Sequence, residues 1–363
     1  MSEQLKLRDS GTCEFDVVSL GEVMLRLDPG QHRIRDARRF EPWVGGGEFN
    51  VANGLSSCFG LKTSVVTALA RNEIGQLMLN LIRAGGIDTS LIRWTDDEGP
   101  GGARNGLNFT ERGFGLRGAL GVSDRAGSAA SKLAAGDIDW HDLFGRRGVR
   151  WLHTGGVFTA LSESTAELAY EAVKIAKQYG TVVSYDVNFR PSLWKAMGDI
   201  DRHTRDVGRI FEHVDVLFSN EPEYRLSIGE KVIDDGASQS TRFERMVEDL
   251  SRRYSQISVV AATLRTVHSA SDNSWAGIAW SSTEGFVTST YREHVEVLDR
   301  VGAGDAFAAG CAFGLLSSRS LRSSLELGAA HGILTMTTPG DTSSASAGEV
   351  EALAAGARAL TMR

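Results

Sequence analysis

Residues 297–310 carry the strongest structural signal in the chain, and they read VLDRVGAGDAFAAG. A strand-like run leads into a Gly-Ala-Gly turn, from which small and apolar residues continue as a helix. Glycines let the backbone turn tightly and let a ligand approach without interference from Cβ atoms. The first amides of the new helix have no partners within it, and the helix dipole lies behind them. The turn therefore predicts a binding site for an anion.

Asp305 follows this turn directly, in the first turn of the predicted helix. A carboxylate beside a bound phosphate is repelled unless a metal ion or a proton transfer compensates for its charge. A general base that takes the proton from an attacking hydroxyl fits this position. We therefore predict that Asp305 is a catalytic base.

Other interpretations of the same stretch have to be weighed. A dinucleotide-binding GxGxxG motif would need a third glycine where Phe307 stands. A Walker loop would need Gly-Lys followed by Ser or Thr, which the chain does not contain. A plain helix cap fits the local spacing as well as the anion site does, so the rest of the chain has to decide.

Outward from this stretch, short β-rich runs alternate with longer amphipathic segments. Such alternation is typical of βαβ units and a mainly parallel sheet, with ligands beyond the carboxyl ends of the strands. We predict an α/β fold with strands at 15–20, 64–69, 149–154, 182–187, 214–219 and 257–263. The predicted helices include 50–59, 73–84 with Asn72 as its cap, 221–228 and 241–254. Another predicted helix begins at a capping box of Ser164 and Glu167 and ends at Gly180.

Two stretches, 24–44 and 100–122, interrupt this alternation. The first alternates polar and apolar residues, and the second contains a strand-like segment, Ala103–Thr110. Both suit strands that project from the sheet as a small β lid, and the alternative is two ordinary surface loops. The core domain would then comprise residues 1–23, 45–99 and 123–363.

Composition excludes several classes of function. The 363 residues carry a formal net charge of −7, which argues against nucleic acid as a main partner. The three cysteines form no CxxC pair, so neither a disulfide framework nor a zinc site is expected. No stretch stays apolar for the ~20 residues of a membrane helix. The polar N-terminus has no secretory signal, and we expect a cytoplasmic protein.

Residues 299–305, DRVGAGD, resemble the signature of the ribokinase-like (PfkB) family of carbohydrate kinases. Two more motifs of that family occur in the same order. Residues 45–52, GGGEFNVA, resemble its di-glycine entry to the first long helix, and residues 220–223, NEPE, resemble its N-x-x-E motif. The resemblance extends from Phe15 to about Asp341. It implies a three-layer α/β/α domain with a mainly parallel sheet and a small β lid.

Within the family, the chain is most similar to 2-keto-3-deoxygluconate kinases. Residues 184–194, SYDVNFRPSLW, resemble a segment of those enzymes, and so do residues 124–131, DRAGSAAS. Arg300 also occurs in this subgroup, where the wider family usually has threonine. The chain departs from the subgroup at Ser123 and Asp124, where a tyrosine is common, and its lid lacks the usual tyrosines, which leaves the exact sugar open.

The resemblance implies a role for each part of the site. At the sugar end it places Gly46, Gly47 and Asn50, and a substrate carboxylate would bind Arg125 and Arg190. A planar guanidinium binds a carboxylate through two parallel hydrogen bonds, although each arginine taken alone would be assigned to a surface ion pair.

For the phosphoryl transfer, the resemblance implies ATP and Mg²⁺. The nucleotide would contact Asn220, Thr263, Arg265, Gly302 and Gly304. Mg²⁺ would be held by Glu223 and Asn220, mainly through water. The amides of Gly302, Ala303 and Gly304 would stabilise charge on the transferring group, with Asp305 as base.

The expected reaction is transfer of the γ-phosphoryl group of ATP to the 6-hydroxyl of 2-keto-3-deoxygluconate. Two alternatives stay open, a kinase for a neutral sugar such as fructose or ribose and a catalytically silent sugar-binding protein on the same fold. As in related kinases, a monovalent cation could bind at residues 338–341, and lid strands could pair between subunits in a homo-oligomer. His331 is expected either against adenine or, more simply, as a packed histidine of its helix.

Overall fold

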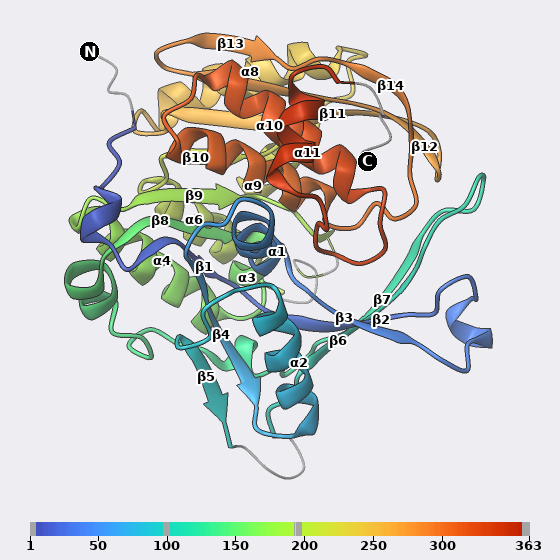
Figure 1. Cartoon of the computed structure of the whole chain (residues 1–363). Helices are drawn as coiled ribbons and strands as arrows, with labels where there is room; N and C mark the ends of the chain where they lie inside the picture. Colours follow the sequence, from blue (N-terminus) through green and yellow to red (C-terminus); the bar gives the residue numbers. More distant parts are fainter. Residues whose placement is uncertain (1–4, 97–101, 192, 194–197, 358–363) are drawn as a thin grey trace.

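The structure, a computed structural model, describes residues 5–96, 102–191, 193 and 198–357 (Figure 1). Ser192 and Trp194 of the kinase-like segment 184–194 lie outside the described residues, as do Pro100 and Gly101 of the predicted lid.

The centre of the molecule is a sheet of ten strands in the order β13-β12-β11-β10-β9-β8-β1-β4-β5, with β14 paired to β12. Every pair from β11 to β5 is parallel, whereas the pairs that β12 makes are antiparallel. The predicted mainly parallel sheet is therefore confirmed. Its strands are β1 (Phe15–Leu20), β4 (Thr63–Ala70), β5 (Ile92–Thr95), β8 (Val149–Gly155), β9 (Val182–Asp186), β10 (Val216–Phe218), β11 (Val259–Ser269), β12 (Asp272–Ser281), β13 (Gly285–Thr288) and β14 (Arg292–Glu296).

Helices cover both faces of this sheet because its strands are apolar on both sides. In β1, Val18 and Leu20 join one core cluster while Val17 joins the other. One face packs against α3 (Gly156–Thr159), α4 (Glu163–Gln178), α6 (Ile200–Phe211), α7 (Glu221–Ser227) and α8 (Gln239–Arg253). The other packs against α1 (Gly47–Asn53), α2 (Glu73–Ala84), α9 (Ala303–Leu316) and α10 (Leu321–Thr335), with α11 (Ala347–Ala354) outside α10. Among the described residues, no helix combines the length and the apolar character needed to cross a bilayer.

A second, four-stranded sheet projects from the core as the predicted lid (Figure 1). Its strands are β2 (Met24–Asp28), β3 (Glu41–Gly45), β6 (Gly106–Glu111) and β7 (Leu120–Asp124), in the order β3-β2-β6-β7. Leu25 and Val44 are buried with residues of α2, which fixes the base of the lid to the core. The domain boundaries given above stay a prediction, and β7 runs two residues past residue 122.

Two helix starts bear on the local predictions. Asn72 caps α2 as predicted, because its side chain accepts from the amide of Gly75. The capping box at Ser164 and Glu167 is wrong. Ser162 is the cap of α4, and Thr165 completes the box, since a Thr hydroxyl three residues on can accept from the cap amide as a Glu carboxylate does.

Candidate active site

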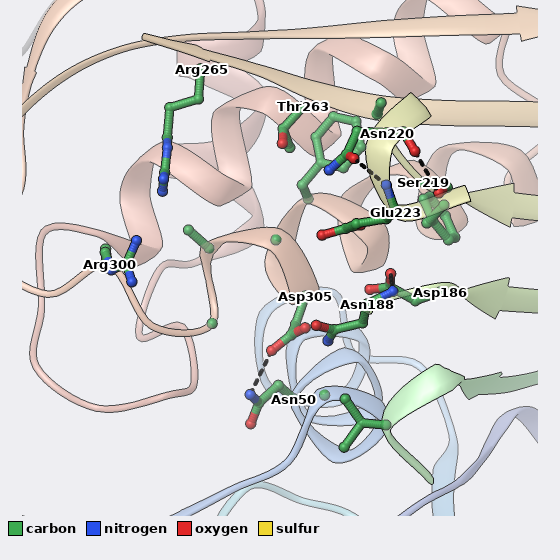
Figure 2. A pocket seen from close by; sticks show the side chains of 18 of the residues that line it. Asn50, Asp186, Asn188, Ser219, Asn220, Glu223, Thr263, Arg265, Arg300 and Asp305 are labelled. Carbon is green, nitrogen blue, oxygen red and sulfur yellow. Dashed lines mark hydrogen bonds between the residues drawn. The ribbon is translucent and has the colours of Figure 1, made fainter. Parts of the chain in front are cut away.

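A pocket of about 840 Å³ lies at the carboxyl ends of β9, β10 and β11, between the core and the lid (Figure 2). This is the edge at which parallel α/β sheets bind ligands. The stretch 300–305 and the start of α1 form its opposite wall. All the predicted site residues line it, namely Gly46, Gly47, Asn50, Arg125, Arg190, Asn220, Glu223, Thr263, Arg265, Gly302, Ala303, Gly304 and Asp305.

Asp305 lies in the first turn of α9, where it faces α1. The amide nitrogen Nδ2 of Asn50 donates to its Oδ2 at 2.7 Å (Figure 2). Burial raises the pKa of Asp305 to about 6; the charge of Asp341 adds to this, while the Asn50 bond and the charge of Arg190 oppose it. A carboxyl with a pKa near neutrality is suited to proton transfer.

The turn before Asp305 is open at its amides. Gly302 caps α9 in the left-handed conformation, with φ of 77°, and no side chain of the described residues caps this helix end. A Cβ atom at Gly302 would lie 1.8 Å from the carbonyl oxygen of Asp341, so only glycine fits there. A Cβ at Gly304 would meet nothing within 4 Å. The first amides of α9 therefore face open space, which is the geometry of an anion site.

Carboxylates gather on the opposite side of the pocket. Burial raises the pKa of Asp186 well above its usual value, and the charges of Glu223 and Asp305 raise it further. Burial also raises the pKa of Glu223, although Arg190 and Asn220 oppose this shift. The positive charge of the neighbouring protein groups does not balance these carboxylates. Mg²⁺, which prefers carboxylate and water oxygens as ligands, would balance them. Asp186, Glu223 and Asn220 could hold that ion.

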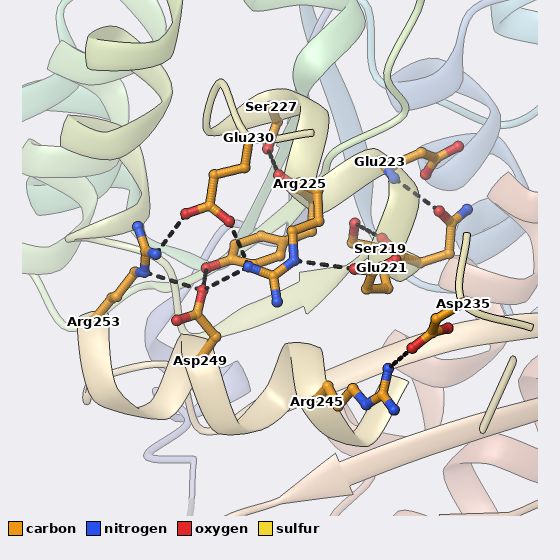
Figure 3. A network of polar contacts seen from close by, with 12 residues as sticks. Ser219, Glu221, Glu223, Arg225, Ser227, Glu230, Asp235, Arg245, Asp249 and Arg253 are labelled. Atoms are coloured by element: carbon orange, nitrogen blue, oxygen red, sulfur yellow. Dashed lines mark hydrogen bonds and ion pairs between the residues drawn. The ribbon is translucent and has the colours of Figure 1, made fainter. Parts of the chain in front are cut away.

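Helix α7 presents Asn220 and Glu223 to the pocket, and a network behind it holds it in place (Figure 3). Asn220 caps α7 by accepting from the amide of Glu223 at 3.0 Å. On the far side, Arg225 donates to Glu221 at 3.0 Å and to Glu230 at 2.5 Å. The Tyr224 hydroxyl donates to Asp249 of α8 at 2.8 Å. These bonds fix the helix whose first turn faces the proposed ion.

The two arginines predicted for a substrate carboxylate differ in their surroundings. Arg190 is exposed to the pocket, and no ion pair of Arg190 occurs within the described part of the chain. Arg125 instead pairs with the buried Glu22, whose other oxygen accepts from Ser128. Arg125 therefore lies at the predicted place, but its charge is already balanced by a carboxylate of the protein.

Arg265 and Arg300 lie at the end of the pocket away from Asn50 (Figure 2). Burial and the charge of Arg300 lower the pKa of Arg265. Two neighbouring guanidinium groups repel one another, and an anion bound between them offsets this repulsion. In the sequence Arg300 is only a feature shared with the subgroup, whereas in the structure its side chain lines the pocket.

Sequence reasoning also missed Asp186 and Asn188 as site residues. Asp186 ends β9, and its carboxylate accepts from the amide of Asn188 at 3.2 Å. Asn188 lines the pocket with a positive φ of 35°, a backbone conformation that is uncommon outside glycine. An Asp-x-Asn sequence directly after a buried strand was the available signal.

His331 is buried in α10, where its ring contacts Phe59 with centroids 5.1 Å apart. Burial lowers its pKa to about 4, and it does not line the pocket. Of the two expectations, the packed histidine agrees with this position.

A buried arginine of the lid connects the lid to the segments on either side of the turn before α9. The Arg26 side chain, on β2, is only 1% exposed. Its guanidinium donates to Asp299 at 2.5 Å, to Asp341 at 2.5 Å and to Asp28 at 3.2 Å. Burial opposes its charge, yet Asp341 and Asp299 hold its pKa above the usual value. Asp299 in turn accepts from the amides of Val301 and Gly340. Arg26 thus orders both segments that surround Gly302.

The family model of pfkB family carbohydrate kinases matches residues 14–347. The chain belongs to this family, which confirms the prediction of a sugar kinase. A putative ribokinase II from E. coli, which shares the fold with a TM-score of 0.74 at 18% identity, was crystallised in complex with ATP and Mg²⁺.

Three relatives illustrate how far the similarity reaches. A 2-dehydro-3-deoxygalactonokinase of Haloferax volcanii is 27% identical over 93% of this chain and 95% of its own. A 5-dehydro-2-deoxygluconokinase of Clostridium beijerinckii is 26% identical over 87% of this chain and 86% of its own. The crystal structure of 2-dehydro-3-deoxygluconokinase from Thermotoga maritima superposes with a TM-score of 0.84 at 32% identity, covering 94% of this chain and 99% of that one.

We expect the substitution Arg26→Met to lower the free energy of unfolding by about 3–5 kcal/mol, because it leaves the buried carboxylates of Asp299 and Asp341 without their cation, while Asp28 keeps Arg112. Urea unfolding followed by circular dichroism measures the change. Arg35→Met is the matched control: its side chain is 73% exposed and pairs with Asp36, which is 66% exposed, so a loss of about 0–1 kcal/mol is expected. Equal losses in both variants would contradict the role given to Arg26.

Proposed function

We propose that the chain transfers the γ-phosphoryl group of ATP to the 6-hydroxyl of 2-keto-3-deoxygluconate. The observation that carries this proposal is Asp305, held by Asn50 at the open amide end of α9. The relatives named above support the substrate class, because their names refer to dehydro-deoxy derivatives of gluconate or galactonate. Arg190 provides the guanidinium that a sugar acid needs.

The proton transfer is assigned to Asp305. Asn50 binds Oδ2, which leaves Oδ1 as the atom that takes the proton of the 6-hydroxyl. Gly47 lies close enough that a Cβ there would be 3.6 Å from Oδ1, so its lack of a side chain makes room for the sugar. Gly46 belongs to the same wall of the pocket. A general base held in one orientation typically raises the reaction rate by a factor of about 10²–10⁴.

We assign stabilisation of the negative charge on the transferred phosphoryl group to the backbone amides of Gly302, Ala303 and Gly304. Each such donor is typically worth ~10²–10³ in rate. When bound with ATP, Mg²⁺ neutralises charge on the phosphate oxygens. Glu223 and Asn220 would hold this ion, mainly through water, together with Asp186.

Nucleotide contacts are assigned to the end of the pocket that carries Arg265. Thr263 and Arg265 come from β11, Asn220 from the cap of α7, and Gly302 and Gly304 from the turn of α9. Arg300 joins them as the second cation of that end. The guanidinium groups of Arg265 and Arg300 would bind phosphate oxygens, because that contact relieves their mutual repulsion.

One observation favours the neutral-sugar alternative. Glu22 balances the charge of Arg125, so a substrate carboxylate at that point would meet a guanidinium that is already paired. A sugar such as fructose or ribose could instead accept hydrogen bonds from Arg125 and Asn50. The catalytically silent alternative has no such support, since Asp305 and the open amides of α9 are both in place.

A monovalent cation at the turn 338–341 also remains a proposal. The carboxylate of Asp341 in this turn binds Arg26 at 2.5 Å. An added cation would therefore depend on backbone carbonyl oxygens of the turn rather than on this side chain.

The test is ATP-dependent phosphorylation with Mg²⁺ of 2-keto-3-deoxygluconate, its galacto epimer, fructose and ribose. We expect turnover of a keto-deoxy acid, a loss of about 10²–10⁴ in kcat for Asp305→Asn, and a rise in KM for Arg190→Gln with that acid. Turnover of a neutral sugar alone, unaffected by Arg190→Gln, would keep the kinase and contradict the carboxylate role. If none of the four sugars reacts, the substrate proposal is wrong.

A dependence on pH follows from the pKa of Asp305, which is about 6. The base acts in its deprotonated form, so kcat/KM should rise as pH increases through about 6 and level off above it. Asn50 lowers this pKa, and Asn50→Ala should therefore shift the midpoint of the profile upward. Initial rates at saturating ATP between about pH 5 and pH 8 measure both. A flat profile would remove Asp305 from the proton transfer.

We further propose a homo-oligomer that pairs through the lid. Strand β7 is the edge of the lid sheet and is exposed along its whole length, with Leu120 44% and Val122 49% exposed on one face. An exposed apolar edge strand is a template for pairing with a second copy.

Light scattering after gel filtration should give a multiple of the 39.1 kDa of one chain. The double variant Leu120→Lys, Val122→Lys should shift the mass toward a monomer, because lysine opposes edge pairing. Val267→Lys, at an apolar position 55% exposed on β11, should leave it unchanged. A mass near one chain for the unmodified protein excludes the oligomer.

A further inference from the structure

Three side chains with metal-binding atoms meet outside the active-site pocket, at the turn from β11 to β12 and on the adjacent strand β14. They are His268, Asp272 and His294, and one ligand atom of each lies within 4.8 Å of the other two. None of them lines the pocket or has a part in the proposed reaction. We propose that this group binds a divalent transition-metal ion of the zinc class.

Irregularities of the sheet bring the two histidines together. In β11, His268 is an extra residue, because Val267 pairs with Asn273 and Ser269 with Asp272. In β14, His294 lies in a second bulge, since the register with β12 shifts between Asn273 and Trp275. Bulges turn a side chain away from the face that simple alternation would give it. Both strands that flank β12 thus carry a bulge at the same level, each with a histidine.

The backbone at His294 supports a specific role for its side chain. Its φ is 54°, a left-handed conformation that costs free energy in a residue other than glycine. In that conformation Nδ1 of His294 lies 3.0 Å from Asp272. The ring of His268 lies beside it, with centroids 4.9 Å apart, and its Nε2 is 2.8 Å from the hydroxyl of Ser274, which limits its rotation.

The ligand set selects the kind of ion. Two imidazole nitrogens and one carboxylate oxygen suit Zn²⁺, Co²⁺, Ni²⁺ or Cu²⁺, whereas Mg²⁺ prefers oxygen ligands alone. Glu296 stands directly opposite Asp272 in the β12–β14 register. Carboxylates opposed across two strands repel one another, and a divalent cation beside them offsets that repulsion.

The cluster also adjoins the contact between the lid and the core. The turn from β11 to β12 lies between His268 and Asp272 in the sequence. The amide of Ala270 in this turn donates to the carbonyl oxygen of Gly115 at the lid tip at 2.8 Å, and the amide of Gly115 donates to the hydroxyl of Ser271 at 3.0 Å. An ion that joins β11, β12 and β14 would fix this turn and so stabilise its contact with the lid tip.

The first experiment is calorimetric titration of the metal-free, full-length protein with ZnCl₂, with Co²⁺ absorption in the visible range as an independent readout. We expect one site per chain, weakened at least about tenfold in His294→Ala and in Asp272→Asn. His141→Ala removes an exposed histidine outside the cluster and should leave the affinity unchanged. Excess Mg²⁺ should not compete.

Absence of a saturable Zn²⁺ or Co²⁺ signal would overturn the site, and so would equal affinity in the cluster variants and the unmodified protein. Hydrogen exchange at the Gly115 amide tests the link to the lid. Zn²⁺ should slow this exchange in the unmodified protein and not in His294→Ala. Exchange that is unchanged by Zn²⁺ would overturn the link. Neither readout requires turnover, so both are independent of the proposed kinase reaction.

Discussion

The ion cluster around Arg26 is the interaction on which the active-site geometry depends most directly. One guanidinium from lid strand β2 binds Asp299, before the Gly302 turn, and Asp341, after α10. The carbonyl of Asp341 in turn lies against Gly302, at a place where no Cβ would fit. The lid base, the turn that starts α9 and the C-terminal loop are therefore one connected unit. This buried charge tolerates little displacement, because a lost contact with Asp299 or Asp341 leaves a desolvated carboxylate without its cation.

Much of the fold could be predicted because its signals are local. Buried strands such as β1 show as apolar runs, and the cap at Asn72 shows as a single residue before a helix. The lid was expected from an interruption of the alternation, although the order β3-β2-β6-β7 joins strands distant in sequence, which a local pattern does not specify. The capping box of α4 was misplaced by two residues because Ser162 and Ser164 both fit a cap, and only the backbone geometry distinguishes them.

For the site, the sequence could place residues but not their partners. Short motifs around Asp305, Asn50 and Glu223 led to residues that do line one pocket. The pairing of Arg125 with Glu22 could not be foreseen, because 102 residues separate them along the chain and neither belongs to a recognisable charge pattern. The same holds for Arg26, which on its own resembles any polar residue of an alternating strand. Roles that depend on such long-range contacts become visible only in three dimensions.

The small size of the contact at the lid tip has a consequence for how ligands enter. Two hydrogen bonds join Gly115 to the β11–β12 turn. Two bonds of this kind together contribute about 1–3 kcal/mol net, so the detached state of the tip would hold roughly one molecule in six to one in 160. If a ligand enters only when the tip is detached, its observed association rate falls by the same fraction. In most molecules without ligand the lid tip would then be attached. The rate of ligand binding would be set by how often this contact breaks.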